Sequence, residues 1–300
     1  MMLLSAAVAC ALTTAPKPPV KVVPDITYAT VGKEKIQLDL VLPAGPGPHP
    51  VVLCFHGGAW TGGSRKELTT PSVRIPGVTT TPSTEVGILE NLARRGYAAA
   101  TVSYRLAPKA KFPSQIEDAK TAVRFLRANA KKYDLDPDRF AALGFSAGGH
   151  LALLLGTTDT AAGFDGTEYA DQSSKVQCVI DFFGPTDLAL YAKSEGIEDG
   201  YLVPVFGKAC KTDPTVFKKA SPMTYVRKDA PPILILHGTL DLIVPIKHSE
   251  MLYKALTDVG ATVEMHTVSF AGHGGWNDRD MQKAQDAVFH FLDAHLKGQK

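Results

Sequence analysis

The amino-acid sequence predicts an α/β fold, in which a mostly parallel sheet is covered by helices on both faces. Strand-like runs alternate with helical stretches along the chain, and this alternation is typical of a sheet wound with right-handed crossovers. The runs in the middle of the chain are almost continuously apolar, as expected for parallel strands that are buried on both sides. With 300 residues, of which 45% are hydrophobic and 21% charged, the chain can bury a large core.

Eight segments are predicted to be strands. The first two alternate between apolar and polar residues and should form an antiparallel opening pair, whereas most of the others are short apolar runs. In chain order they cover residues 26–30, 36–42, 51–55, 97–104, 140–145, 176–183, 233–238 and 263–270. Helices are predicted over residues 114–133, 149–157, 248–260 and 280–296, and Gly260 is suited to end the third of these.

One domain is expected over residues 25–300, with two long insertions. Residues 61–85 are rich in Thr and Pro and nearly free of periodicity, and residues 184–230 separate two strands by more than a crossover needs. Loops of this length in a compact domain are usually functional or disordered. Both segments leave strands at the carboxyl edge of the sheet, where ligands bind in open α/β folds. We therefore expect them to serve as a lid and as a pocket wall.

Residues 1–24 resemble a secretory signal followed by a Pro-rich linker. The apolar stretch is too short to span a bilayer, and Ala9-Cys10-Ala11 has the pattern of a cleavage site. No Lys or Arg precedes the apolar core, which departs from the usual signal. Export to the periplasm or the medium is the expectation, with lipid anchoring at Cys10 as the minor alternative.

Composition argues against several classes of partner and cofactor. The net charge is only +2 and no run of five or more Lys and Arg occurs, so nucleic acid is not expected as a partner. Without Cys10, the remaining cysteines are Cys54, Cys178 and Cys210, which cannot form a disulfide framework. No Cys/His spacing indicates a metal, and no cofactor is expected.

The pentapeptide Gly144-Phe145-Ser146-Ala147-Gly148 follows a predicted strand and precedes an apolar helix. This context is the test of a nucleophile elbow, a sharp turn that lifts the serine hydroxyl above the sheet. A Gly/Ser turn without chemistry is the alternative, and the flanking strand and helix argue against it. Ser146 is therefore the candidate nucleophile.

A serine hydroxyl needs a base, and the base needs a third group that orients it. Of the nine histidines, His273 lies on a glycine-flanked loop just after the last strand, whereas the others fall on helices, in strands or in positions that shape loops. Asp241 lies between Ser146 and His273 in the chain and just beyond a strand, which is the order this kind of triad requires. A helix-capping role is the alternative for Asp241.

An oxyanion formed during attack needs fixed N–H donors. The residue after the nucleophile, Ala147, should supply one, and the loop after an early strand should supply the rest. That loop reads His56-Gly57-Gly58-Ala59-Trp60, where Gly58 and Ala59 are the best donors. Trp60 and Trp276 flank the two catalytic loops, and each either lines a substrate pocket or packs in the core.

Several motifs in order now resemble the α/β-hydrolase superfamily. They are residues 55–60, 103–127, 144–152, 220–245 and 271–276. The similar branch comprises hormone-sensitive-lipase-like and feruloyl or acetyl xylan esterase-like carboxylesterases. The resemblance covers about residues 25–297 and implies Ser146 as nucleophile, His273 as base, Asp241 as acid and an oxyanion hole from Gly58, Ala59 and Ala147. Ala59 departs from the lipase-like pattern, where a third glycine is usual.

The function expected from these observations is hydrolysis of carboxylic esters by a serine esterase. Short-chain or aromatic acyl esters are the expected substrates, with acetyl or feruloyl groups on plant polysaccharide suggested by the resemblance alone. The loop His56–Trp60 also resembles that of kynurenine formamidase-like hydrolases, so an arylformamidase or another amidase or peptidase is an alternative. A binding protein that has lost catalysis is a further alternative, against which the intact Ser, Asp, His order argues.

Overall fold

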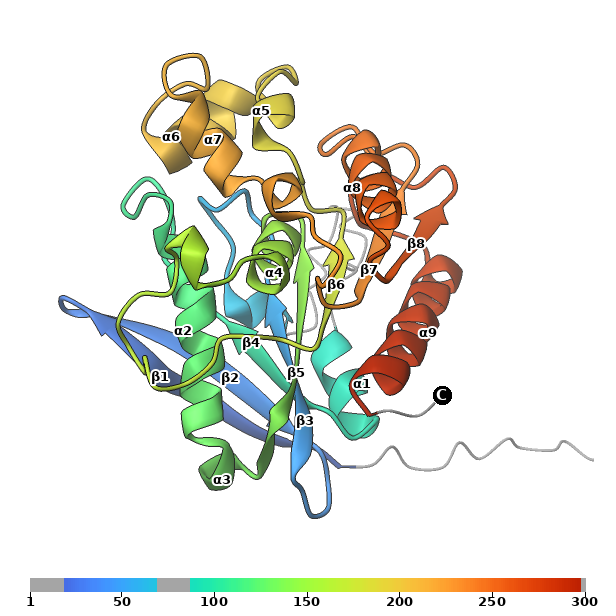
Figure 1. Cartoon of the computed structure of the whole chain (residues 1–300). Helices are drawn as coiled ribbons and strands as arrows, with labels where there is room; N and C mark the ends of the chain where they lie inside the picture. Colours follow the sequence, from blue (N-terminus) through green and yellow to red (C-terminus); the bar gives the residue numbers. More distant parts are fainter. Residues whose placement is uncertain (1–18, 69–86, 298–300) are drawn as a thin grey trace, which may run out of the picture.

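The computed structural model describes residues 19–68 and 87–297, and in them the strands form one eight-stranded sheet (Figure 1). The strand order is β1-β2-β4-β3-β5-β6-β7-β8. Strand β2 runs antiparallel to both of its neighbours, and the pairs from β4 to β8 are all parallel. The predicted fold class, with its antiparallel opening pair, is therefore confirmed. The strands are β1 (Lys21–Val31), β2 (Glu34–Leu42), β3 (His49–Phe55), β4 (Ala98–Val102), β5 (Leu135–Phe145), β6 (Cys178–Phe182), β7 (Ile233–Gly238) and β8 (Val263–Val268).

Some boundaries differ from those predicted. Strand β1 begins at Lys21, ahead of the predicted start at residue 26, because Lys21 and the two valines after it pair with the end of β2. The predicted helix over 114–133 is divided at Asn129, whose side-chain amide donates to the Phe125 carbonyl at 2.9 Å. Asparagine competes in this way with the helical backbone and is a poor residue inside a helix. The helices are α1 (Ile88–Arg94), α2 (Ser114–Ala128), α3 (Ala130–Tyr133), α4 (Ala147–Thr157), α5 (Leu188–Tyr191), α6 (Val203–Phe206), α7 (Pro214–Ala220), α8 (Lys247–Asp258) and α9 (Asp278–His295).

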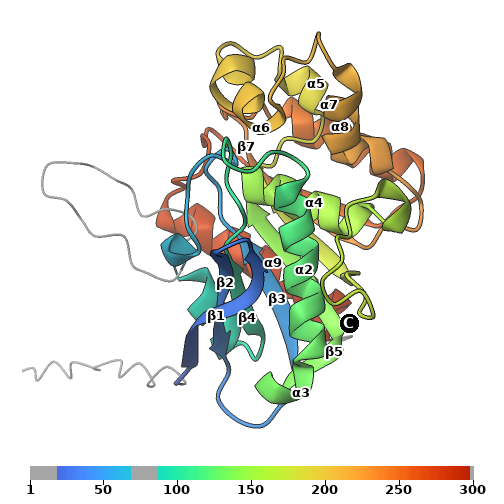
Figure 2. The same ribbon diagram turned by 90° about the vertical axis from the view of Figure 1, so that its left-hand side faces the viewer.

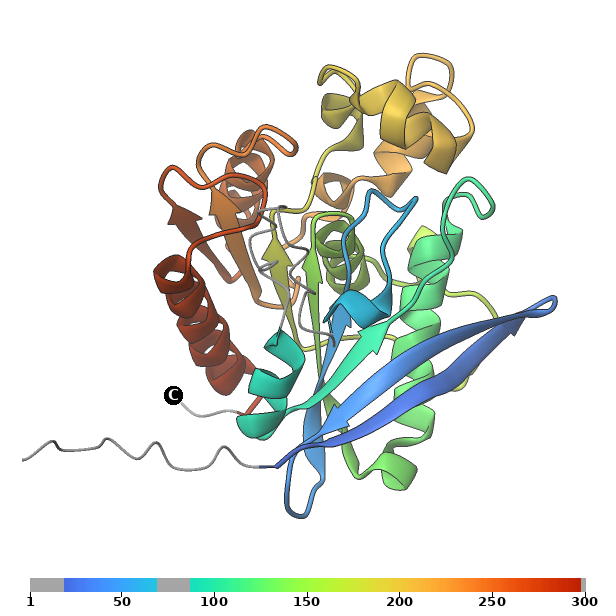
Figure 3. The same ribbon diagram turned by 180° about the vertical axis from the view of Figure 1, so that it is seen from behind.

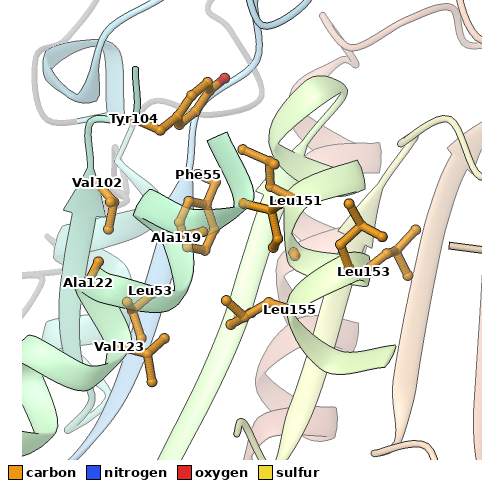
Figure 4. Close-up of a cluster of buried hydrophobic side chains, with 14 of the residues drawn as sticks. Leu53, Phe55, Val102, Tyr104, Ala119, Ala122, Val123, Leu151, Leu153 and Leu155 are labelled. Atoms are coloured by element: carbon orange, nitrogen blue, oxygen red, sulfur yellow. The ribbon is translucent and has the colours of Figure 1, made fainter. Parts of the chain in front are cut away.

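Helices cover both faces of the sheet and bury two separate apolar layers (Figures 2 and 3). One layer contains the apolar residues of α2, α4 and α8, and the other contains those of α1 and α9. In the first layer, Ala119 and Leu151 lie with Phe55 of β3 among fully buried side chains (Figure 4). Cys54 and Cys178 are also fully buried, as small core residues should be.

The parallel strands bring their following loops together at one edge of the sheet. Phe55 of β3 pairs with Gly144 of β5, so the loop after β3 lies beside the turn after β5. Gly238 of β7 pairs with Val268 of β8, so the loops after these two strands are also neighbours. The insertion 184–230 contains α5, α6 and α7, which stand above this edge (Figure 1).

Two sequence-based expectations concern segments that are only partly described. The signal-like residues 1–18 and residues 69–85 of the first insertion lie outside the described residues. The described start of that insertion includes a 3₁₀ turn, Arg65–Leu68. An ion pair anchors this turn to the sheet, because Arg65 Nε lies 3.1 Å from the carboxylate of the buried Asp39. Among the described helices, none combines the length and the apolar character that crossing a membrane requires.

Candidate active site

Ser146 occupies the sharp turn between β5 and α4. Its backbone angles are φ 54° and ψ −117°, a conformation that L-residues rarely adopt and that stores strain. Its N–H donates to the Phe182 carbonyl at 2.8 Å, which ties the turn to the neighbouring strand. A Cβ atom at Gly144 would overlap the Gly148 carbonyl, and one at Gly148 would overlap the Phe55 carbonyl. The glycines of the pentapeptide are therefore required by the close approach of strand and helix.

The structure brings Ser146, His273 and Asp241 into one hydrogen-bonded chain. Nε2 of His273 lies 2.9 Å from Oγ of Ser146, and Nδ1 lies 2.6 Å from Oδ2 of Asp241. An ionised carboxylate only accepts hydrogen bonds, so Nδ1 carries the proton and Nε2 of the neutral ring accepts from the serine hydroxyl. The tautomer is thus the one in which imidazole can take the hydroxyl proton.

The Asp241 carboxylate has an unusually complete set of donors. Oδ1 accepts from the N–H groups of Ile243 and Val244, each at 2.9 Å, and Oδ2 faces His273 and, at 3.2 Å, Nε2 of His237. Burial alone would raise the pKa of Asp241, but the hydrogen bonds from His237 and His273, together with the positive charge of His273 when its ring is protonated, lower it well below its usual range. The carboxylate therefore remains ionised beside the imidazole.

The loop after β3 turns its backbone toward the same site. Gly58, Ala59 and Trp60 have φ values of 102°, 51° and 59°, so three consecutive residues lie in the left-handed region. Consecutive N–H groups in such turns can form a concave anion site. The hydroxyl of Tyr104 donates to the His56 carbonyl at 2.9 Å, and its ring stacks on the His56 imidazole. This packing supports the loop from behind.

A cavity of about 300 Å³ joins this loop to the triad. Gly58, Ala59 and Ala147, the three predicted oxyanion residues, line it together with Ser146 and His273. As the first residue of α4, Ala147 has an N–H group without a partner inside its own helix. The remaining lining residues are Trp60, Thr61, Pro185, Tyr191, Tyr201 and Ile243.

Residues of the insertion 184–230 form part of the cavity wall. Pro185, Tyr191 and Tyr201 come from it, and none of the three was singled out by sequence reasoning. The only signal was the length of the insertion, because its short helices have no periodic pattern that would indicate which side chains face inward. Phe183 was also missed. Its ring packs against the His273 imidazole at a centroid distance of 4.6 Å.

The two tryptophans have different environments. Trp60 is buried and lines the cavity. Trp276 is buried in the second apolar layer, where it contacts Phe182 and Phe183, and its indole N–H donates to the Gly272 carbonyl at 3.1 Å. Trp276 does not line the cavity that the described residues form, so its contacts support the packing alternative.

Among the described residues, no group of three or more His, Cys, Asp and Glu side chains could hold a metal ion.

An elbow serine above a mostly parallel sheet, with an acid and a histidine on the loops that follow later strands, is the architecture of an α/β hydrolase. The family model BD-FAE matches residues 38–256, and the chain belongs to this family of α/β hydrolases. Esterase LipC of Mycobacterium tuberculosis is 31% identical over 230 residues, which are 76% of this chain and 53% of LipC. Esterase LipQ of the same organism is 32% identical over 253 residues, 82% of this chain and 54% of LipQ. The chain thus spans about half the length of the curated relatives it matches.

Solved structures of similar proteins cover nearly the whole fold. A truncated carbohydrate esterase from gut microbiota superimposes with a TM-score of 0.76 at 26% identity, covering 91% of this chain and 96% of that one. The propionate-bound thermophilic esterase Est2 of Thermogutta terrifontis gives a TM-score of 0.70 at 26% identity, with 92% and 94% covered. Both agree with the α/β-hydrolase fold.

Proposed function

We propose that this protein is a serine carboxylesterase that hydrolyses short-chain or aromatic acyl esters through an acyl-enzyme. The observation that carries the proposal is the hydrogen-bonded chain from Ser146 Oγ through His273 to Asp241, which opens into a cavity lined by Gly58, Ala59 and Ala147. The esterase relatives and esterase structures described above support a carboxylic ester hydrolase.

In the first half of the reaction, Oγ of Ser146 attacks the ester carbonyl carbon while Nε2 of His273 takes the hydroxyl proton. The carbonyl oxygen becomes an oxyanion, which accepts hydrogen bonds from the N–H groups of Ala147, Gly58 and Ala59. The imidazolium is stabilised by the ionised Asp241 carboxylate. Collapse of the intermediate breaks the bond to the alcohol, which leaves with the proton from His273, and the acyl group stays on Ser146.

In the second half, water repeats the attack on the acyl-enzyme. His273 takes a proton from the water molecule, the oxyanion forms again at the same donors, and Ser146 leaves as the alkoxide that His273 reprotonates. The products are the carboxylic acid and the free enzyme. Losing one oxyanion donor typically costs about 3 kcal/mol of barrier, so the left-handed loop at Gly58 and Ala59 has a direct energetic role in this scheme.

The size and lining of the cavity support a small acyl group. Its volume of about 300 Å³ lies at the lower end of the range for small-molecule sites. Trp60, Tyr191 and Tyr201 offer aromatic surface on which an aromatic acyl group could stack. Acetyl or feruloyl groups on plant polysaccharide are the proposed natural substrates, supported by the similarity to a carbohydrate esterase of gut microbiota.

An amidase, such as an arylformamidase, or a peptidase is the second candidate, because the same triad can attack an amide carbonyl. The observation that favours this candidate is the loop His56–Trp60, whose sequence resembles the corresponding loop of kynurenine formamidase-like hydrolases. A binding protein without catalysis is the third candidate. The complete triad argues against it, since a hydrogen-bonded Ser-His-Asp chain has no use in binding alone.

The test compares the wild-type protein with Ser146→Ala and with Ser173→Ala, an exposed serine that serves as the matched control. The substrates are p-nitrophenyl acetate and butyrate, methyl ferulate, acetylated xylan and N-formylkynurenine. We expect ester turnover by the wild type and the control, and a loss of about 10⁴- to 10⁶-fold in kcat for Ser146→Ala. Turnover of the formamide alone would favour the amidase, and undiminished ester turnover by Ser146→Ala would refute the serine mechanism.

Export is also proposed, on the signal-like residues that precede the described domain. Expression of the full chain in a bacterial host, followed by N-terminal sequencing of the protein from the periplasm and the medium, tests it. Cleavage after Ala9 or Ala11 is the expected result, and an intact N-terminus found only in the cytoplasm would contradict it.

A further inference from the structure

A second histidine contacts the Asp241 carboxylate from inside the protein. His237 is the penultimate residue of β7 and is completely buried. Its Nε2 lies 2.8 Å from the Val244 carbonyl oxygen and 3.2 Å from Oδ2 of Asp241, and its Nδ1 lies 2.6 Å from Oγ of Ser249 on α8. His237 does not line the cavity that the described residues form, so it does not contact the substrate.

These contacts fix which ring nitrogen of His237 carries the hydrogen in the neutral imidazole. A carbonyl oxygen and a carboxylate are both acceptors only, so Nε2 of His237 must carry a hydrogen and donate between Val244 and Asp241. In the neutral ring Nδ1 is then an acceptor, and the hydroxyl of Ser249 donates to it. Both ring nitrogens are used, which leaves the imidazole with one tautomer and one orientation.

The consequence for Asp241 concerns its second oxygen. Oδ1 is held by two backbone N–H groups of its own loop, from Ile243 and Val244. Without a further donor, Oδ2 would be held only by His273, the residue that it must itself orient. His237 supplies a donor to Oδ2 that is independent of the catalytic loop, because it stands on β7 and is braced by α8.

We propose that His237 is a positioning residue for ester hydrolysis, which holds Oδ2 of Asp241 where it accepts the hydrogen bond from Nδ1 of His273. The role rests on the proposed function, since it acts through the triad. Small displacements of a catalytic group can lower a rate by about 100-fold, so loss of this donor should lower kcat. It should leave KM nearly unchanged, because the cavity lining is untouched.

Two substitutions of similar polarity test the hydrogen bonds of Nε2 and of Nδ1 separately. In His237→Gln, the amide nitrogen reaches about as far as Nε2 and can still donate toward Asp241 and Val244. In His237→Asn, the shorter amide reaches only about as far as Nδ1 and retains the partner on Ser249 alone. His266→Asn, a half-exposed histidine on β8, is the matched control outside the site. Each variant is measured for kcat and KM with p-nitrophenyl acetate and for its melting temperature.

We expect His237→Asn to lose about 10- to 100-fold in kcat with KM within about twofold of the wild type. His237→Gln should recover most of that loss, whatever the two substitutions do to the melting temperature, and His266→Asn should behave as the wild type. Equal kcat losses in His237→Asn and His237→Gln, or no loss in either, would overturn the positioning role. The proposed esterase function would still stand if the wild type were active and Ser146→Ala inactive. A wild type without ester turnover would overturn both.

Discussion

Oδ2 of Asp241 lies 2.6 Å from Nδ1 of His273, although 32 positions separate the two residues in the chain. The parallel pairing of β7 with β8 brings their loops together, and the short polar contact is the result. Because His273 also reaches Ser146, this contact decides which nitrogen of the imidazole faces the serine hydroxyl.

Asp241→Asn is expected to remove the carboxylate that fixes the tautomer of His273, while keeping the shape of the side chain. An amide can present its NH₂ group to the imidazole, which then adopts the tautomer that cannot accept the serine proton. We expect kcat for p-nitrophenyl acetate to fall by about 10⁴-fold. Asp278→Asn, an exposed carboxylate at the start of α9, is the control and should retain full turnover. A loss below tenfold in Asp241→Asn would assign the orienting role to another group.

Gly148→Ala is expected to destroy the elbow, because the added Cβ would overlap the carbonyls of Phe55 and His56. These are backbone atoms of a buried strand end and cannot move aside easily. The soluble yield and the melting temperature should fall, and esterase activity should be lost. Gly200→Ala provides the control, since a Cβ there meets no atom within 4 Å. A Gly148→Ala protein with the melting temperature and kcat of the wild type would contradict the packing described for the elbow.

Tyr201→Ala is expected to alter substrate preference without unfolding the protein. Tyr201 lines the cavity, yet 38% of its surface is exposed, so its removal costs little core packing. The ratio of kcat/KM for methyl ferulate to that for methyl acetate should fall by about 2- to 12-fold, which corresponds to the loss of one aromatic contact. Tyr253→Ala, on α8 and 39% exposed, should leave the ratio unchanged. An unchanged ratio in Tyr201→Ala would remove this residue from the substrate site.

Asp181→Asn is expected to stabilise the protein at pH 8 more than at pH 5. The side chain of Asp181 is completely buried, and burial raises its pKa from 3.8 to about 7 against the opposing effects of His237 and the Gly184 N–H. The folded protein therefore holds this proton more tightly than the unfolded chain, so wild-type stability decreases as the pH rises from about 4 to about 7. Asparagine has no such proton and can still accept from the Gly184 N–H.

Urea unfolding of both proteins at pH 5 and pH 8 measures this difference. The gain in the free energy of unfolding of Asp181→Asn over the wild type should be larger at pH 8, by an amount on the order of 2 kcal/mol. The same difference at both pH values would mean that Asp181 does not change its protonation between them.

Much of the fold and the triad could be predicted because the signals are local. A buried parallel strand is a short apolar run, and the residues just beyond it must lie at the carboxyl edge of the sheet. Ser146, Asp241 and His273 each follow such a run, which is why their order alone brought them together as candidates. The Gly-rich loop at Gly58 and Ala59 could be placed for the same reason.

Other parts of the site could not be predicted because tertiary packing decides them. Tyr191 and Tyr201 lie in an insertion whose helices are too short to show a periodic pattern, so their inward orientation has no sequence signal. His237 precedes a glycine at a strand end, and its sequence context favours a role in shaping a loop. Only the positions of Asp241, Val244 and Ser249 around its ring reveal the hydrogen bonds that it makes.

The most direct measurement of the central claim is to trap the acyl-enzyme. The wild-type protein is mixed with p-nitrophenyl acetate, quenched in acid within the first turnovers and digested, and the peptides are compared by mass spectrometry. The account predicts that one acetyl group is present on the peptide that contains Ser146, and that Ser146→Ala treated in the same way carries none. Ester hydrolysis without an acetyl group on Ser146, or with it on another residue, would contradict the account.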